Sequence, residues 1–181
     1  MKRPAVFLDR DGTLIEDAGF LRVATDVDFY SQTIPALRRL GDFSLFIVTN
    51  QSGIAQGHIS ADEAHAVNEH VVRRLSEAGI NIRAVYCCPH QRTDECECMK
   101  PKPYFLKSAA LDHQIELQRS FVVGDHPSDV ELAQAVGATG IYVLTGHGAK
   151  HLGELHAPGV VVADIGAAVE LILAADTCMS R

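Results

Sequence analysis

Two aspartates stand one residue apart where an apolar segment ends, and together they could take part in phosphoryl transfer. The segment covers residues 5–8 and is followed by Asp9, Arg10, Asp11 and Gly12. Four consecutive apolar residues favour a buried parallel strand that Gly12 ends, so the aspartates are expected at its carboxyl end, where open α/β sheets bind ligands. An extended backbone directs Asp9 and Asp11 to the same side and Arg10 away from them. A shared Mg²⁺ ion would relieve the repulsion between the two carboxylates.

Further polar residues follow two other apolar segments, and they could complete a phosphate site. One segment leads into Thr49-Asn50-Gln51-Ser52, where hydroxyl and backbone N–H groups could hold phosphate oxygens. Another ends in Gly124-Asp125, with Asp129 shortly after, and adds carboxylates for a cation. Lys100 offers the fixed positive charge that a transferring phosphoryl group needs. A common Asp-Gly turn is the alternative interpretation of the first segment, and the later segments argue against it.

In this order, DxDGT, a strand ending in Thr49, Lys100 and GDxxxD resemble the haloacid dehalogenase (HAD) superfamily of phosphohydrolases. The resemblance implies that Asp9 is the nucleophile that becomes an aspartyl phosphate and that Asp11 is the general acid and base. Asp11 should then have a pKa above that of Asp9. The implied Mg²⁺ ligands are the carboxylates of Asp9 and Asp125 and the backbone carbonyl of Asp11. The implied phosphate- and substrate-binding residues are Thr49, Asn50, Gln51, Ser52 and Lys100, with Asp129 in support.

A second group of residues has the chemistry of a metal site. Cys88, His90, Cys96 and Cys98 bring three thiols and one imidazole together in a short segment, and this is a ligand set that Zn²⁺ takes in a tetrahedron. A disulfide and scattered core cysteines are the alternatives, and neither explains the histidine. Four protein ligands leave no open position, so we predict a structural Zn²⁺ that stabilises a loop with little core of its own.

This loop narrows the resemblance to one branch of the superfamily, the histidinol-phosphate phosphatases and the D-glycero-D-manno-heptose 1,7-bisphosphate 7-phosphatases. Both have Cys-Pro-His, Cys-x-Cys and Lys-Pro, as this chain does from Cys88 to Pro101. Residues 50–55 resemble the heptose enzymes, whereas the short span between His90 and Cys96 resembles the histidinol-phosphate enzymes. The resemblance favours removal of the 7-phosphate of the heptose bisphosphate, a step in lipopolysaccharide precursor biosynthesis. A histidinol-phosphate phosphatase or a broad sugar-phosphate phosphatase is the alternative.

Two positions depart from the pattern of this branch. Met99 and Gln56 stand where arginines are usual, and each loss removes a charged hydrogen bond of about 1.5–3 kcal/mol. Arg22, Lys150 and the histidines of residues 147–151 could replace these cations, with plain solvent exposure as the alternative. A zinc-stabilised binding protein without catalysis is disfavoured, because the whole set of carboxylates is present.

Composition fits one enzyme domain and argues against other classes of protein. With 181 residues, 47% hydrophobic and 22% charged, the chain can bury a core without disulfides. A net charge of −7 argues against a nucleic-acid partner, since phosphate backbones attract clustered Lys and Arg. No apolar run approaches the roughly 20 residues of a membrane span, and no signal-peptide pattern is present. We expect a cytoplasmic monomer that acts on a small phosphorylated metabolite, with no nucleic-acid or membrane partner.

Strands and helices are expected to alternate along the chain, which is typical of a doubly wound, Rossmann-like parallel sheet with helices on both faces. The expected strands are 4–8, 44–49, 83–87, 120–123 and 140–144, with a short apolar run at 159–163. The expected helices are 34–40, 60–78, 104–111, 129–136 and 166–175. Ser60 and Glu63 form a capping-box pattern at the start of the second helix.

The domain organisation follows from the same pattern. Only a loop fits between Leu14 and Ser31, where larger relatives insert a cap domain, so the cap should be small or absent. We expect a single phosphohydrolase domain over residues 1–175, which includes the zinc loop at 88–98. Residues 176–181 show no periodic pattern and are expected to form a C-terminal tail.

Overall fold

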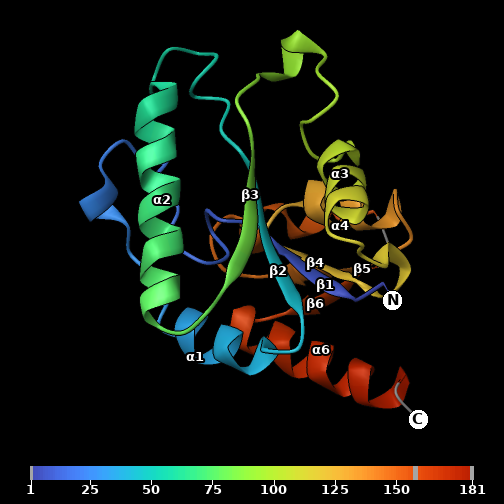
Figure 1. Cartoon of the computed structure of the whole chain (residues 1–181). Helices are drawn as coiled ribbons and strands as arrows, with labels where there is room; N and C mark the ends of the chain where they lie inside the picture. The colour runs from blue at the N-terminus through green and yellow to red at the C-terminus, as the bar shows by residue number, and fades with distance from the viewer. Residues whose placement is uncertain (1, 157–158, 180–181) are drawn as a thin grey trace.

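The computed structural model describes residues 2–156 and 159–179 and contains one parallel β-sheet between helices (Figure 1). The strand order is β3-β2-β1-β4-β5-β6, and every neighbouring pair is parallel. Each strand lies close to its predicted segment, so the predicted strands are confirmed. The strands are β1 (Ala5–Leu8), β2 (Ser44–Asn50), β3 (Ile82–Cys88), β4 (Phe121–Gly124), β5 (Thr139–Val143) and β6 (Val160–Val162).

The helices of the described residues also follow the predicted segments, except for the short α5, which was not predicted. They are α1 (Thr33–Leu37), which a 3₁₀ turn over Arg38–Leu40 continues, α2 (Ala61–Glu77), α3 (Tyr104–Asp112), α4 (Pro127–Gln134), α5 (Gly148–His151) and α6 (Ile165–Met179). Further 3₁₀ turns cover Ala24–Asp26, Arg92–Asp94, Leu117–Arg119 and Leu152–Glu154. The capping box is present, because Ser60 accepts from the Glu63 backbone N–H at 3.0 Å and Glu63 accepts from the Ser60 N–H at 2.7 Å.

The predicted end of the last helix is wrong. Helix α6 continues through residues 176–179, which were expected to belong to a C-terminal tail, while 180–181 lie outside the described residues. Its buried residues Ala168, Val169 and Ile172 pack into the core. This packing offsets the unfavourable free energy of starting the helix. Each further helical residue then adds one hydrogen bond at little cost in free energy.

The two faces of the sheet bury alternate residues of each strand. Val6 and Leu8 of β1 pack in a cluster that includes residues of α1, α2 and α6, whereas Ala5 and Phe7 pack toward α3 and α4. Figure 1 shows α2 and α3 on opposite sides of the sheet. The predicted doubly wound fold is therefore confirmed, and the apolar run of β1 reflects a strand that is buried on both faces.

The strand order places a crevice where the site was predicted. The chain runs outward from β1 through β2 to β3, and then outward in the other direction from β4 to β6. Loops that leave neighbouring strands in opposite directions open a crevice at their carboxyl ends. Asp9 follows β1 and Asp125 follows β4, so both aspartates lie at this crevice.

The described residues between β1 and α1 form no separate domain over the crevice. The linker from Leu14 to Ser31 is fully described and contains only the 3₁₀ turn Ala24–Asp26 and isolated β-bridges. The predicted absence of a large cap is confirmed in this segment. Across the described parts of the chain, no helix has both the length and the apolar character that crossing a membrane requires.

Candidate active site

A buried lysine lies between two aspartates at the carboxyl end of the sheet. Lys100 Nζ is 2.6 Å from Asp9 Oδ1 and 2.7 Å from Asp129 Oδ1. The Asp9, Asp125 and Asp129 carboxylates lie within 4.8 Å of one another. The site thus brings together residues from three distant segments and places three carboxylates against one ammonium group.

Burial and like charge make this cluster a place for a cation. Burial raises the pKa of Asp9 against the opposing effect of Lys100. Burial and the Asp9 charge raise the pKa of Asp125 to about 8. Burial alone would lower the pKa of Lys100, but Asp129 and Asp9 outweigh it and raise the pKa. The ligands are carboxylate oxygens, which suit a hard divalent ion such as Mg²⁺ and fit the cofactor that the sequence motifs imply.

Two glycines allow the loops to approach this closely. Gly12 has φ +76°, and a Cβ there would lie 2.1 Å from Asp125 Oδ2. A Cβ at Gly124 would lie 2.1 Å from Asp129 Cγ. Any side chain at Gly12 would therefore collide with a carboxylate as well as strain the backbone.

Asp11 is held by its neighbours in a way that the sequence did not predict. Arg10 is fully buried and donates from Nε and Nη2 to the Asp11 carboxylate at 2.9–3.2 Å. The prediction that Arg10 points away from Asp11 is wrong, because β1 ends at Leu8 and its alternation does not continue into the turn. Burial raises the pKa of Asp11, while Arg10 opposes the shift.

The polar side chains at the carboxyl end of β2 and in the loop after it lie in two different places. Thr49, Asn50 and Ser52 line the cleft at the site. Gln51 instead donates from Nε2 to Asp11 Oδ2 and Thr49 Oγ1, each at 2.8 Å, and is not among the residues that line this cleft. Its side chain is placed to support Asp11 and Thr49, and a direct contact with substrate stays a prediction.

The site opens into a cleft of about 840 Å³ with a mixed charged lining. Met99 is part of this lining, so a thioether stands where an arginine was expected. Gln56 lines a smaller adjoining hollow. Arg92 and Lys102 also line the cleft, and their only signal in the sequence is their position in and beside the zinc loop.

The cations proposed as replacements for the missing arginines lie in different places. His147 lines the cleft, and its backbone N–H donates to Asp125 Oδ2 at 2.7 Å. Arg22 forms an exposed ion pair with Glu63 at 3.0 Å and does not line the cleft. Lys150 and His151 are also absent from the cleft lining. Of the predicted replacements, His147 alone is positioned at this cleft in the described part of the chain.

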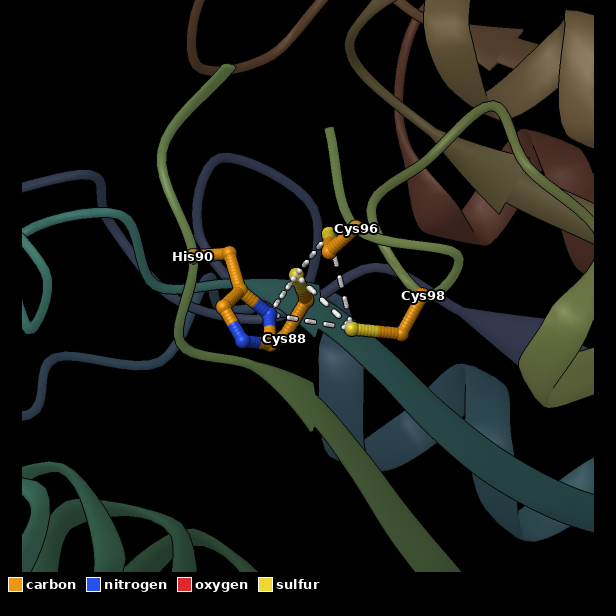
Figure 2. A group of neighbouring side chains, drawn as sticks. All are labelled: Cys88, His90, Cys96 and Cys98. Atoms are coloured by element: carbon orange, nitrogen blue, oxygen red, sulfur yellow. Dashed lines mark hydrogen bonds between the residues drawn. The ribbon is translucent and has the colours of Figure 1, made fainter. Parts of the chain in front are cut away.

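The predicted zinc ligands converge on one point (Figure 2). Cys88 Sγ lies 3.2 Å from Cys98 Sγ and 3.7 Å from Cys96 Sγ, and His90 Nδ1 lies 3.3 Å from Cys98 Sγ. Zn–S bonds of about 2.3 Å give sulfur–sulfur edges of about 3.8 Å in a tetrahedron, so the four ligand atoms have nearly the spacing that Zn²⁺ requires.

The loop of the predicted zinc ligands also leads directly to the cluster of Lys100, Asp9 and Asp129. Lys100 follows Cys98 closely in the chain, and its backbone N–H donates to Asn50 Oδ1 at 3.2 Å. Lys102 donates to the carbonyl oxygen of Cys96 at 2.6 Å. The position of Lys100 therefore depends on the conformation of the loop that contains Cys88, His90, Cys96 and Cys98.

The chain is similar to proteins of known family. Residues 97–168 match the HAD-hydrolase-like family model. The D-glycero-D-manno-heptose-1,7-bisphosphate 7-phosphatase of Thermosynechococcus vestitus is 38% identical over 95% of this chain and 96% of its own. The D-glycero-beta-D-manno-heptose-1,7-bisphosphate 7-phosphatase of Yersinia pestis is 34% identical over 92% of this chain and 95% of its own.

A solved structure supports the same relationship. The D,D-heptose 1,7-bisphosphate phosphatase from B. bronchiseptica, complexed with magnesium and phosphate, superimposes with a TM-score of 0.87 and 30% sequence identity. The match covers 94% of this chain and 98% of that chain. Together, these relatives and the site geometry show that the chain belongs to the heptose-1,7-bisphosphate 7-phosphatase family of HAD-like phosphohydrolases.

Proposed function

We propose that the protein is a Mg²⁺-dependent phosphatase that removes the 7-phosphate of D-glycero-D-manno-heptose 1,7-bisphosphate through an aspartyl phosphate on Asp9. The observation that carries this proposal is the buried Lys100, which lies 2.6 Å from Asp9 and 2.7 Å from Asp129. This arrangement holds a carboxylate and a cation together at the base of a cleft. The names of the relatives supply the substrate.

The residues divide the reaction between them. A carboxylate oxygen of Asp9 attacks the phosphorus, and the substrate oxygen leaves with a proton from Asp11. Asp11 then takes a proton from a water molecule that attacks the aspartyl phosphate, which releases inorganic phosphate and restores Asp9. Thr49 and Lys100 bind the phosphoryl oxygens, whose charge Lys100 stabilises in the transition state.

Mg²⁺ would be held by the carboxylates of Asp9 and Asp125 and by the backbone carbonyl of Asp11. When bound, it supplies positive charge that reduces the repulsion between the anionic nucleophile and the phosphate. Asp129 keeps Lys100 in place through the 2.7 Å contact and accepts from the His126 backbone N–H at 3.2 Å. It therefore acts in support of the site.

The second metal that we propose is a structural Zn²⁺ bound by Cys88, His90, Cys96 and Cys98. Support comes from the convergence of all four ligand atoms. Because four protein ligands fill a tetrahedron, this ion would have no open position for substrate. Its function would be to organise the loop that carries Lys100.

The substrate is best tested by side-by-side kinetics. Phosphate release from the heptose bisphosphate, from histidinol phosphate and from common sugar monophosphates would be compared by kcat/KM. A preference of about a hundredfold for the bisphosphate, near 2.7 kcal/mol of discrimination, would support the proposed substrate. Equal, low rates on all of them would instead favour a broad sugar-phosphate phosphatase.

Covalent catalysis is tested by Asp9→Asn. This variant should lose turnover while keeping its circular dichroism spectrum, because an amide oxygen is a far weaker nucleophile than a carboxylate. The matched control is Asp42→Asn, an exposed change outside the cleft, which should keep the wild-type rate. Near-normal turnover by Asp9→Asn would exclude the aspartyl phosphate.

A further inference from the structure

Arg10 connects the predicted acid Asp11 to helix α2. Its side chain is fully buried and binds the Asp11 carboxylate through Nε and Nη2 at 2.9–3.2 Å. Its remaining nitrogen, Nη1, donates to Asn68 Oδ1 at 2.6 Å. Asn68 belongs to α2 and is 7% exposed. The three side chains form a continuous hydrogen-bonded series from the cleft to the helix.

The hydrogen-bonded series of Asp11, Arg10 and Asn68 meets both requirements of a buried arginine. A buried guanidinium needs both a negative charge and acceptors for its N–H groups, or its desolvation is not compensated. Asp11 supplies the charge, whereas Asn68 supplies a neutral acceptor that does not compete for it.

Helix α2 is a rigid support for the hydrogen-bonded series of Asp11, Arg10 and Asn68. It starts with the capping box at Ser60 and buries Val67, Val71 and Leu75 in the core. Asp11 itself directly precedes a turn over residues 12–14, and this local backbone alone would not define the direction of its side chain. Gln51 and Arg10 hold the carboxylate from two directions.

We propose that Arg10, anchored by Asn68, is a positioning residue that keeps the Asp11 carboxylate beside the oxygen of the leaving group. This inference rests on the proposed role of Asp11 as the general acid. Neither Arg10 nor Asn68 lines the cleft, so they act through Asp11 without touching substrate.

The ratio of the rates on two substrates with different leaving groups tests this role, because a general loss of structure would lower both rates equally. An alkyl phosphate expels a poor leaving group and needs a well-placed acid. p-Nitrophenyl phosphate expels a stabilised phenolate and needs the acid much less. Asp11 also acts as the base in the second step, which both substrates share, so the comparison uses kcat/KM, which reports only the steps up to formation of the aspartyl phosphate. A displaced Asp11 should therefore lower kcat/KM for the first substrate more than for the second.

The principal variant is Asn68→Asp, which keeps the size of the side chain but offers Arg10 a competing carboxylate. We expect kcat/KM for an alkyl sugar phosphate to fall about tenfold or more, which is part of the roughly 10²–10⁴-fold contribution of general acid catalysis. The kcat/KM for p-nitrophenyl phosphate should change little. Asn81→Asp is the matched control, since it makes the same change at an exposed position outside the cleft. If Asn68→Asp does not fold, Asn68→Ala removes the anchor without adding charge.

The results distinguish failure of the positioning role from failure of the proposed function. Equal losses of kcat/KM on both substrates, or no loss on either, would overturn the positioning role of Arg10 and Asn68. Asp11→Asn tests the proposed function by itself, because loss of the acid must also affect the alkyl substrate selectively. If Asp11→Asn lacks that selectivity, the acid assignment fails. In the double variant, Asn68→Asp should add no further selectivity to Asp11→Asn.

Discussion

Lys100 and Asp9 meet at 2.6 Å although 91 residues separate them in the chain. The contact joins the end of β1, where the proposed nucleophile lies, to the segment that follows the proposed zinc ligands. Both side chains are almost completely buried, so each compensates the charge of the other in a setting where water cannot. Stability and catalysis therefore depend on the same pair.

Lys100→Met should weaken both properties. The change leaves Asp9 and Asp129 without their cation, which should lower the free energy of unfolding by about 3 kcal/mol. The rate should fall by about 10²–10³, the usual cost of losing one charge-stabilising group. Urea unfolding and phosphate release would measure the two effects. Lys107→Met, at an exposed position of α3, should change neither, and wild-type activity in Lys100→Met would remove Lys100 from the mechanism.

Loss of the zinc ligands should destabilise the protein and inactivate it at the same time. We expect one Zn²⁺ per chain in metal analysis, and Cys98→Ser should lose the ion, lower the Tm and reduce turnover by displacing Lys100. Cys87→Ser changes the neighbouring thiol of β3, which is outside the ligand set, and should retain the ion. Full zinc content in Cys98→Ser would show that another set of ligands binds it.

Alanine substitutions at Gly12 and Gly79 should distinguish the effect of steric crowding from the effect of backbone strain. Gly12→Ala would place a Cβ 2.1 Å from Asp125 Oδ2, so we expect loss of Mg²⁺-dependent activity. Gly79→Ala has a similar positive φ of +82° but nothing within 4 Å of the added Cβ. It should cost about 1–2 kcal/mol of stability and leave turnover intact. Equal activity losses in both variants would show that strain, and not contact with Asp125, decides the effect.

Met99→Arg should restore a cation to the cleft wall. If the lost arginine limits recognition of the second phosphate, this variant should raise kcat/KM for the heptose bisphosphate about tenfold relative to a monophosphate, as one charged hydrogen bond implies. Thr93→Arg adds the same charge in the zinc loop outside the main cleft and should not alter that ratio. An unchanged ratio in Met99→Arg would show that other groups already supply the binding.

Much of the fold could be predicted because its signals are local. The apolar runs predicted the strands, and the helices follow from periodicity and from the capping box at Ser60. The cysteines and His90 could be predicted as metal ligands from their residue types alone. Their short separation in the sequence makes it feasible for them to converge on one ion. The aspartates after β1 and β4 were predictable for a related reason, since the ends of parallel strands lie at one edge of the sheet.

Other features were decided only by the tertiary structure. Arg10 turns toward Asp11 because the strand has ended, and its final acceptor, Asn68, comes from a helix that no local pattern connects to it. Gln51 supports Asp11, while Arg22 pairs with Glu63 away from the cleft. The sequence by itself determined the residue types at the site and the elements that carry them. The directions of these side chains depended on contacts between distant segments, because a polar group within a turn adopts the orientation in which its neighbours satisfy its charge and hydrogen bonds.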